Sequence, residues 1–407
     1  MHEESLNFES SREAALAQID AVQPAAYAKT RNFLDGKVTR LSPWLTHGWT
    51  DTLEVARRLF EKHSLGFDHK LIFELGWREF FKHVHMHLGN GILGDIREPL
   101  HNHYSNELPL DIRHACTGVH AIDAGVKELY KTGYLHNHVR MWIASYVVHI
   151  RNVHWRTGAD WMIAHLLDGD LASNHLSWQW VAGTFSSKPY LFNAANVKKY
   201  APYWGCPETV IDTDYGTLNE MAASPQDFGP EAKRPKTETP EPECFGLEGL
   251  DVGLPRIDLT LNQPPPIDID KPVVLVHPWN LRACTQEGQI KIGLIDDQFH
   301  SQFKWSAKRW QFVNRALSNC DAILVADGSS PKAVYEWLSL LGQPVHTIEN
   351  LNPGYEAFTA AGGLNEHLHI APLSTILPAL ADDFCRSFSK FYKKGCKLAG
   401  RFDEAIA

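Results

Sequence analysis

Apolar residues recur along the chain with two different spacings. Residues 50–200 carry them three or four positions apart, as in LIFELGWREFFKHVHMHL and HAIDAGVKELYKTG, without any run of strict alternation. This period predicts amphipathic α-helices. From residue 271 onward, short aliphatic runs alternate with the helical stretches KWSAKRWQFVNRAL and PKAVYEWLSLLG; the runs are VVLV (273–276), IGLI (292–295), AILVA (322–326) and VHTI (345–348). Such alternation predicts buried strands in a doubly wound parallel sheet.

A third kind of sequence lies between these two parts. SPQDFGPEAKRPKTETPEPECF (224–245) and NQPPPI (262–267) are rich in proline, glycine and acidic residues and poor in large apolar ones. A segment of this composition cannot bury enough apolar surface to fold by itself, which favours a linker. We therefore predict an all-α domain at 1–204, an acidic, proline-rich linker at 205–270 and an α/β, Rossmann-like domain at 271–407.

Charge is uneven along the chain and limits its range of partners. The 407 residues hold 39 basic and 48 acidic side chains, a formal net charge of −9. The predicted all-α domain carries 21 basic and 21 acidic residues, the linker 4 basic and 14 acidic, and the α/β domain 14 basic and 13 acidic. The excess of acidic residues therefore lies in the linker. The flanking parts are near neutral and can present a basic face, which leaves DNA open as a partner. The overall charge argues against strong non-specific DNA affinity.

The chain gives no signal for a membrane partner or a disulfide-forming compartment. No apolar run is long enough to span a bilayer, and the first residues, MHEESLNFES, are polar. The seven cysteines are scattered and form no CxxC pair. This spacing favours reduced thiols and argues against a structural zinc site or an iron–sulfur cluster. We expect a cytoplasmic protein, in the cytosol or nucleoid.

Four blocks of the first part stand out by their residues: VTRLSPWL (38–45), ELGWREFFKH (74–83), TGYLHNHVRM (132–141) and WRTGADWMIAHLLDGDLASNHLSWQWVAGT (155–184). In this order they resemble the flavin domain of the photolyase/cryptochrome family, over most of residues 27–200. The resemblance implies a helical domain that holds FAD. VLVHPWNLRA (274–283) resembles the first strand and turn of the family's antenna domain. In ordinary members that domain precedes the flavin domain, whereas here it follows it. This unusual order leaves open whether an antenna chromophore binds.

The resemblance implies which residues surround the cofactor. Hydroxyls and backbone N–H groups of the turn before Pro43 suit an anionic pyrophosphate. Arg140 and Asp168 would form an ion pair beside the flavin ring, and Asn174 would face its N5 atom. The same turn also fits an ordinary helix N-cap, and a buried Arg–Asp pair can be structural. The full cofactor set is Tyr27, Thr39, Arg40, Leu41, Ser42, Arg78, Asn137, Arg140, Asp168, Asp170 and Asn174.

The resemblance also implies a pocket for a cyclobutane pyrimidine dimer in damaged DNA. A flipped-out dimer needs an aromatic face, for which Trp77 is suited, and a polar group such as a protonated Glu74 at its carbonyl edge. Two positions depart from the family pattern: Tyr134 replaces a tryptophan, and His138 replaces an arginine that approaches the DNA backbone. The substrate set is Trp77, Asn137, Met141, Tyr134 and Arg31.

Catalytic roles implied by the resemblance fall on Glu74, Asn174, Trp178 and Trp155. The two tryptophans match the flavin-proximal members of the family's electron-transfer chain. A third tryptophan is expected within REPLHNHYSNELP (97–109), which contains none. The candidates for the terminal electron donor are Tyr104, with His101 or His103 accepting its proton, Trp142 and Trp161.

Histidine-rich stretches such as HVHMH (83–87) raise the alternative of a metal site, but no carboxylate or cysteine completes a ligand set, and we expect no metal. Two functions remain open. The first is a deoxyribodipyrimidine photolyase, a carbon–carbon lyase that repairs cyclobutane dimers by electron transfer from photoexcited FADH⁻. It would favour single-stranded DNA, because few DNA contacts are present. The second is a cryptochrome-like blue-light photosensor that reports the flavin redox state to a signalling partner.

Overall fold

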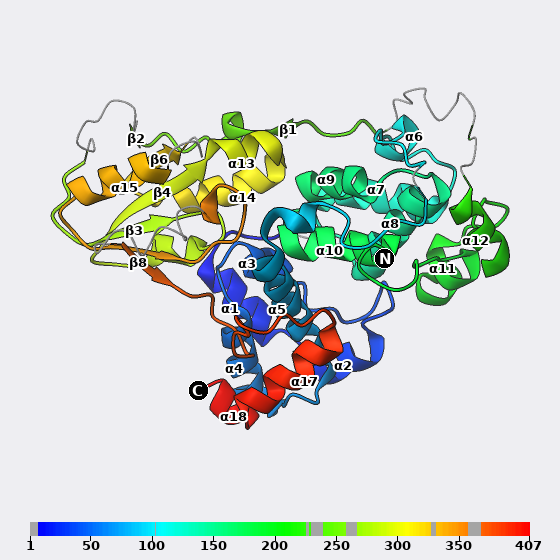
Figure 1. Ribbon diagram of the computed structural model, residues 1–407, viewed down its shortest axis with the longest axis horizontal. Helices are drawn as coiled ribbons and strands as arrows, with labels where there is room; N and C mark the ends of the chain where they lie inside the picture. The colour runs from blue at the N-terminus through cyan, green and yellow to red at the C-terminus, as the bar shows by residue number, and fades with distance from the viewer. Residues whose placement is uncertain are drawn as a thin grey trace. The chain divides into compact units, whose positions relative to one another are not determined.

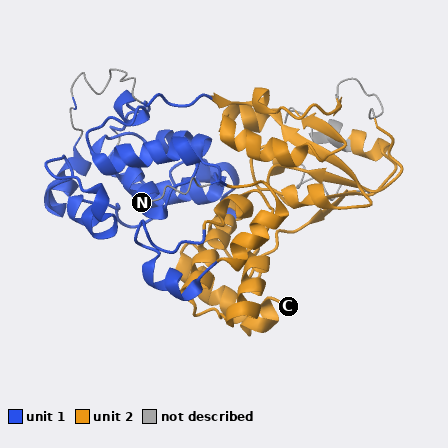
Figure 2. Cartoon of the chain, turned by 180° about the vertical axis from the view of Figure 1, so that it is seen from behind, with its two compact units in different colours: residues 1–7, 22–39, 87–243 blue, residues 8–21, 40–86, 244–407 orange. Residues whose placement is uncertain are grey.

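The computed structural model describes residues 7–101, 103–224, 228, 239–257, 267–326, 331–356 and 368–407. Its contacts divide the chain into two compact units (Figure 2). Unit 1 comprises residues 1–7, 22–39 and 87–243, and unit 2 comprises residues 8–21, 40–86 and 244–407. Both units therefore combine segments that are far apart in the sequence.

Unit 1 is helical, as predicted for this part of the chain (Figure 1). Its core is formed by large apolar side chains such as Trp142, Val147 and Trp178, all at most 2% exposed. Gly133 and Gly183 end two of the helices with φ of 70° and 88°, a conformation that glycine adopts without strain. The helices are α2 (Pro24–Thr30), α6 (Leu110–Arg113), α7 (His120–Thr132), α8 (Asn137–Ser145), α9 (Trp155–His165), α10 (Leu171–Ala182), α11 (Ala194–Tyr200) and α12 (Tyr215–Ala223).

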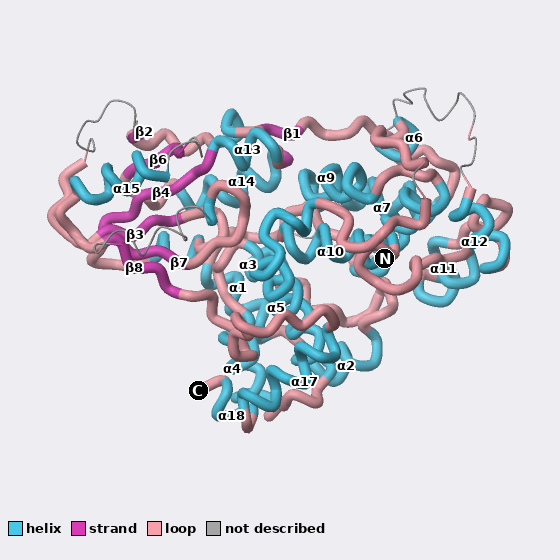
Figure 3. The backbone as a smooth tube through the Cα atoms, in the orientation of Figure 1, coloured by secondary structure: helices cyan, strands magenta, loops and turns pink. Residues whose placement is uncertain are grey.

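Unit 2 contains a parallel sheet with the strand order β2-β6-β4-β3-β7-β8 (Figure 3). Neighbours align in register, for example Val273 with Ile290 on one side and Val345 on the other. The four predicted strands are confirmed, whereas β2 and β8 were not predicted. The strands are β2 (Arg256–Ile257), β3 (Val273–Val276), β4 (Ile290–Asp296), β6 (Ala322–Ala326), β7 (Val345–Ile348) and β8 (Leu368–Ala371); β1 (Cys244–Phe245) and β5 (Trp305–Ser306) form a separate antiparallel pair.

The helices of unit 2 come from both ends of the chain. Helices α14 and α15 fall within the two stretches predicted to be helical after residue 271. The others include a long helix, α5, that carries several of the predicted site residues. The set is α1 (Arg12–Asp20), α3 (Ser42–Thr46), α4 (Thr52–His63), α5 (Lys70–Leu88), α13 (Asp297–Gln302), α14 (Ala307–Leu317), α15 (Pro331–Leu340), α17 (Phe388–Ala399) and α18 (Phe402–Ala405).

The two units do not follow the predicted boundaries at residues 204 and 270. Residues 40–86 join the unit that contains the sheet, because backbone and side-chain bonds connect the two regions. The N–H group of Leu281 donates to the carbonyl of His47 over 2.9 Å, and buried Glu79 accepts from the backbone N–H groups of Ile376 and Leu377. These partners lie some 230 to 300 positions apart, so no local pattern in the sequence reports them.

The predicted linker contains packed structure at several points. It includes α12 and β2, and Ile211, Leu218 and Ile257 are buried. Glu241 lies within unit 1, where it binds Arg113 and accepts from His165 Nε2 over 2.9 Å. Burial opposes ionisation of Glu241, but these two partners outweigh it and lower the pKa of its carboxyl. Linker residues 225–227, 229–238 and 258–266 lie outside the described residues.

Candidate active site

The predicted ion pair of the cofactor set is present in unit 1. Arg140 Nη2 donates to Asp168 Oδ2 over 2.7 Å, and Arg140 Nε donates to the carbonyl of Leu135 over 2.9 Å. The Asp168 side chain is 2% exposed, whereas that of Arg140 is 25% exposed. Burial lowers the pKa of Arg140, but attraction to Asp168 outweighs this cost and the net shift is upward. The Arg140 guanidinium is therefore held as a cation against Asp168, which lies in the loop between α9 and α10.

Asp170 and Asn174 occupy the first turn of α10. Asp170 is the N-cap residue, and its Oδ1 accepts from the backbone N–H of Ser173 over 2.8 Å. This N-cap bond fixes where the Asp170 carboxylate lies. Asn174 is buried, and its Nδ2 donates to the carbonyl of Ala159 in α9 over 2.9 Å. With Nδ2 engaged, Oδ1 remains as the acceptor of this amide.

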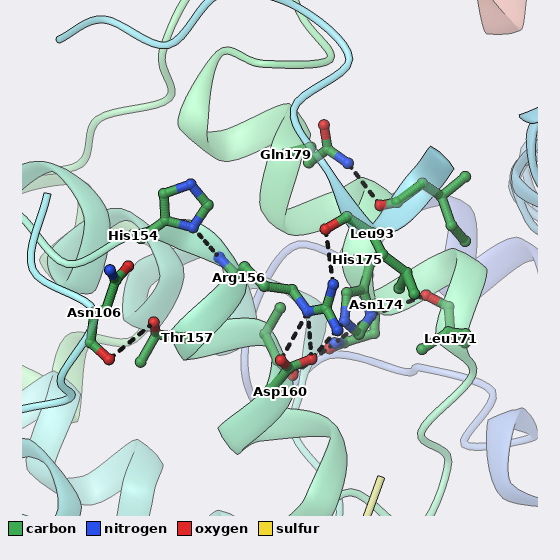
Figure 4. A network of polar contacts seen from close by, with 12 residues as sticks. Leu93, Asn106, His154, Arg156, Thr157, Asp160, Leu171, Asn174, His175 and Gln179 are labelled. Carbon is green, nitrogen blue, oxygen red and sulfur yellow. Dashed lines mark hydrogen bonds and ion pairs between the residues drawn. The ribbon is translucent and has the colours of Figure 1, made fainter. Parts of the chain in front are cut away.

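A polar network that sequence reasoning missed supports Asn174 (Figure 4). His175 is fully buried, and its Nε2 lies 2.9 Å from Asp160 Oδ1. Arg156 Nε donates to the same carboxylate, and Arg156 Nη1 donates to the carbonyl of Leu93. Burial lowers the pKa of His175 despite the neighbouring Asp160. The four-residue spacing of Arg156 and Asp160 on one helix face was the available signal for this pair.

The two predicted electron-transfer tryptophans are both buried in unit 1. Trp178 packs directly on Gly158 of α9, where an added Cβ would lie 2.4 Å from the indole ring. Trp155 begins α9, and its Nε1 donates to Asp95 Oδ1 over 2.5 Å. Glycine at position 158 is therefore needed for Trp178 to reach its place against α9.

Tyr104 lies within a row of aromatic rings that leads to Trp155. The ring of His154 is 5.7 Å from that of Trp155 and 6.0 Å from that of Tyr104. His101 stacks on Tyr104 at 4.1 Å with an interplanar angle of 24°. Burial, with a contribution from Asp95, raises the pKa of Tyr104 to about 12. Oxidation of this phenol would release a proton, and His101 is the nearest stacked base.

The α8 members of the predicted substrate set lie together. Asn137 begins the helix, and its Nδ2 lies 3.3 Å from Met141 Sδ one turn later. The guanidinium of Arg140 lies 5.5 Å from the centre of the Tyr134 ring. His138 stacks on Tyr200 at 4.7 Å, and burial lowers the pKa of its imidazole. His138, which stands where the family has an arginine that approaches the DNA backbone, is therefore stacked on Tyr200, and its protonated form is disfavoured.

The remaining upstream residues of both predicted sets come from α2 and from the segment that precedes α3 in the sequence. Tyr27 is on α2 and Arg31 is its C-cap residue, with Arg31 Nη1 donating to the carbonyl of Ala28. Arg40 has a φ of 53° and an exposed side chain, while Leu41 is buried. Thr39 precedes them, and Ser42 opens α3. A left-handed residue here costs strain of about 1 kcal/mol or more, which often marks a functional turn.

Unit 2 carries the predicted residues of α5. Arg78 Nη2 donates to Thr46 Oγ1 over 2.9 Å, which connects α5 to α3. Glu74 Oε1 accepts from Lys70 Nζ over 2.8 Å. The Trp77 ring stacks on Phe388 of α17, with centroids 4.0 Å apart and planes within 12°. One face of this tryptophan is therefore covered by a segment from the end of the chain.

The predicted site residues thus form two groups, one on each unit. Unit 1 holds the ion pair, Asn174, the electron-transfer residues and the α8 residues, while unit 2 holds Arg40, Leu41, Ser42, Glu74, Trp77 and Arg78. The unit 1 donor set fits a flavin ring, because carboxylates can accept from its N–H group, and guanidinium and amide groups can donate to its carbonyl edge. Ser173 Oγ is also buried there with no hydrogen-bond partner among the described residues.

The described part of the chain has neither a metal-binding cluster nor a helix suited to a membrane. It contains no group of three His, Cys, Asp or Glu side chains that could hold a metal ion. Among the same residues, no helix combines the length and apolar character needed to span a bilayer.

Comparison with known proteins finds photolyases and cryptochromes among the relatives of this chain. A family model described as the FAD binding domain of DNA photolyase matches residues 71–204. A deoxyribodipyrimidine photo-lyase of Streptomyces griseus is 36% identical over 165 residues, which are 39% of this chain and 35% of the relative. A cryptochrome DASH of Natronomonas pharaonis is 32% identical over 247 residues, 57% of this chain and 50% of the relative. The chain thus spans between about a third and a half of these relatives.

Among solved structures, a cryptochrome of Synechocystis sp. matches with 27% identity and a TM-score of 0.44. The match covers 50% of this chain and 45% of the cryptochrome.

Proposed function

We propose, from the premise that residues 71–204 are an FAD-binding domain of the photolyase/cryptochrome family, that this chain repairs cyclobutane pyrimidine dimers in DNA under light. Bound FAD would supply the light-absorbing group and the electron. On the protein side, Arg140 and Asp168 would hold the ring and Asp170 its polar edge. Asn174 offers an amide, which exchanges protons poorly, and so would help to keep the reduced cofactor anionic.

The observation that carries this proposal is the pairing of Asn137 with Met141 on α8. A dimer presents carbonyl groups on one edge and apolar rings on its faces, so its pocket needs polar and apolar groups side by side. The amide of Asn137 and the thioether of Met141 meet this need at a contact of 3.3 Å. Glu74 would donate to the dimer carbonyls from α5 in its protonated form, after giving up its present ion pair with Lys70.

Single-stranded DNA is the proposed substrate form. The stacked imidazole of His138 has a lowered pKa and supplies little positive charge for a phosphate backbone. Opening a duplex to extrude a dimer costs a few kcal/mol, which a single strand does not require. A protein with few backbone contacts therefore gains most from a substrate that is already unpaired.

The decisive experiment is repair of an oligonucleotide that carries one cyclobutane dimer. We expect dimer loss under blue light by the reduced, FAD-loaded protein, none in the dark, and faster repair in a single strand than in a duplex. Denaturation should release FAD from the same preparation. Absence of light-dependent dimer loss from a protein that contains reduced FAD would contradict the proposal.

A blue-light photosensor is the second candidate function. It is favoured by the contact between Trp77 and Phe388, because a stacking face that the chain itself covers is less suited to a DNA base. A photosensor would change its shape or its partner binding with flavin redox state while leaving dimers intact. Light-dependent changes in proteolysis, in a protein that fails the repair assay, would favour this alternative.

A further inference from the structure

Helix α17 concentrates positive charge in a chain whose net charge is −9. Residues 386–401 contain no acidic side chain, and their basic residues are Arg386, Lys390, Lys393, Lys394, Lys397 and Arg401. The helix begins after Ser387, whose hydroxyl accepts from the backbone N–H of Lys390. Basic helices of this kind bind polyanions or anionic membranes. Which partner fits depends on whether the apolar face of the helix is free to enter lipid.

The apolar face of α17 is already in use. Phe388 stacks on Trp77, and Tyr392 donates from its hydroxyl to the carbonyl of Phe67 over 2.7 Å. Gly76 of α5 makes room for this packing, since an added Cβ would lie 2.7 Å from the Tyr392 ring. A membrane-surface helix inserts its apolar face into lipid. Because α17 buries that face against α5, its outward face is left to act as a charged surface in water.

The outward face presents lysines along its length. Lys390, Lys393 and Lys397 are exposed, and Lys390 lies 3.9 Å from Asp383, which Lys394 also binds. Lys393 and Lys397 make no ion pair with any residue that the structure describes. Lys397 lies seven positions after Lys390, a rise of about 10 Å along the helix. Lys393 and Lys397 are four positions apart, so they lie on the same face of the helix.

The preceding segment fixes α17 in this position. Glu79 accepts from the N–H groups of Ile376 and Leu377, and His83 Nε2 lies 2.9 Å from the backbone N of Cys385. Figure 1 shows α17 beside α5, the helix that carries Glu74 and Trp77. The basic face is thus attached rigidly to the α5 part of the proposed lesion surface.

We propose that the outward face of α17 contacts the sugar–phosphate backbone of single-stranded DNA next to the lesion. This inference rests on the proposed function, and it supplies the charge that His138 lacks. Lys393 and Lys397 bind phosphates directly, while Phe388 and Tyr392 hold the helix against α5. The contact is electrostatic, so it applies to a strand of any sequence and does not require a dimer.

The test is fluorescence anisotropy of the full chain with a lesion-free, single-stranded oligonucleotide in the dark, over a range of salt concentrations. The double variant Lys393→Ala with Lys397→Ala should bind the oligonucleotide more weakly. Its slope of log K against log salt should be shallower by about 1.4, at about 0.7 for each lost phosphate contact. The pair Lys393→Arg and Lys397→Arg should bind like the original protein. The matched control is Lys304→Ala with Lys308→Ala, two exposed lysines, one just before β5 and one in the first turn of α14, which should change neither quantity.

An unchanged affinity and salt slope in the double alanine variant would overturn the proposal. So would lysine-dependent binding to phosphatidylserine vesicles with no binding to the oligonucleotide. Because this assay needs neither light nor a dimer, its outcome is separate from that of the repair assay. Loss of repair with α17-dependent DNA binding intact would count against the proposed function alone.

Discussion

The two groups of site residues differ in how they are held. In unit 1, Asn174 is bonded to Ala159, and its neighbour His175 is tied through Asp160 to Arg156. All of these partners lie within 20 positions of one another. In unit 2, Trp77 depends on Phe388 and Glu79 on Ile376, each about 300 positions away. The unit 1 part of the predicted cofactor set is thus built by a local motif, whereas the α5 surface, which carries Arg78 of that set, is completed by residues distant in the sequence.

The largest expected effect tests the unit 1 side alone. Trp178→Phe should abolish light-driven reduction of the oxidised flavin, because phenylalanine is much harder to oxidise than tryptophan. Tyr104→Phe should slow the reaction, since the partly buried ring of Tyr104 lies next to those of His154 and His101. Transient absorption after a blue flash measures both. Undiminished reduction in Trp178→Phe would mean that electrons reach the flavin by another route.

The unit 2 side responds to removal of its distant partner. Phe388→Ala should lower the free energy of unfolding by about 3–5 kcal/mol, as expected for deletion of a buried aromatic ring. It should also free one face of Trp77 while FAD content stays unchanged. Denaturant unfolding and the flavin-to-protein absorbance ratio report the two quantities. A large loss of FAD would show that the two groups depend on one another.

A smaller loss is expected from the ion pair in unit 1. Asp168→Asn removes the charge partner of Arg140 and should destabilise the protein by about 3 kcal/mol, the lower end for buried pairs because Arg140 is partly exposed. Flavin should be lost as well. Asp403→Asn is the matched control, since it breaks an exposed pair with Arg401 that is worth little. Equal stability of the two variants would contradict the assignment.

The smallest effect is a pH dependence in unit 1. Burial lowers the pKa of His149 from 6.5 to about 4, despite its bond to the Val181 carbonyl. The unfolded chain therefore takes up a proton before the folded one does. Stability should be complete above pH 6.5 and fall below it towards pH 4, by about 1.4 kcal/mol per pH unit for this group. In His149→Gln, denaturant unfolding should show a shallower fall; an identical pH profile would exclude His149 as a source.

The same contrast explains what could be predicted from the sequence. The helices within residues 50–200, α14, α15 and four of the six sheet strands follow from local periods, and the Arg140–Asp168 pair follows from the resemblance to the photolyase/cryptochrome family. The two-residue strand β2 is too short to produce a pattern. Apolar spacing on α5 indicates a buried face but not its partner, so the covering of Trp77 by Phe388 could not be predicted. The consecutive domain boundaries missed the grouping of residues 40–86 with the sheet for the same reason.

The most direct measurement of the central claim is dimer repair by two variants of one ion pair on α5. Glu74→Ala should retain FAD but repair a single-stranded cyclobutane dimer about a hundredfold more slowly, because the dimer carbonyls lose their proton donor. Lys70→Ala removes only the present partner of Glu74 and should repair at least as fast as the original protein. Normal repair by Glu74→Ala would contradict the lesion surface proposed on α5.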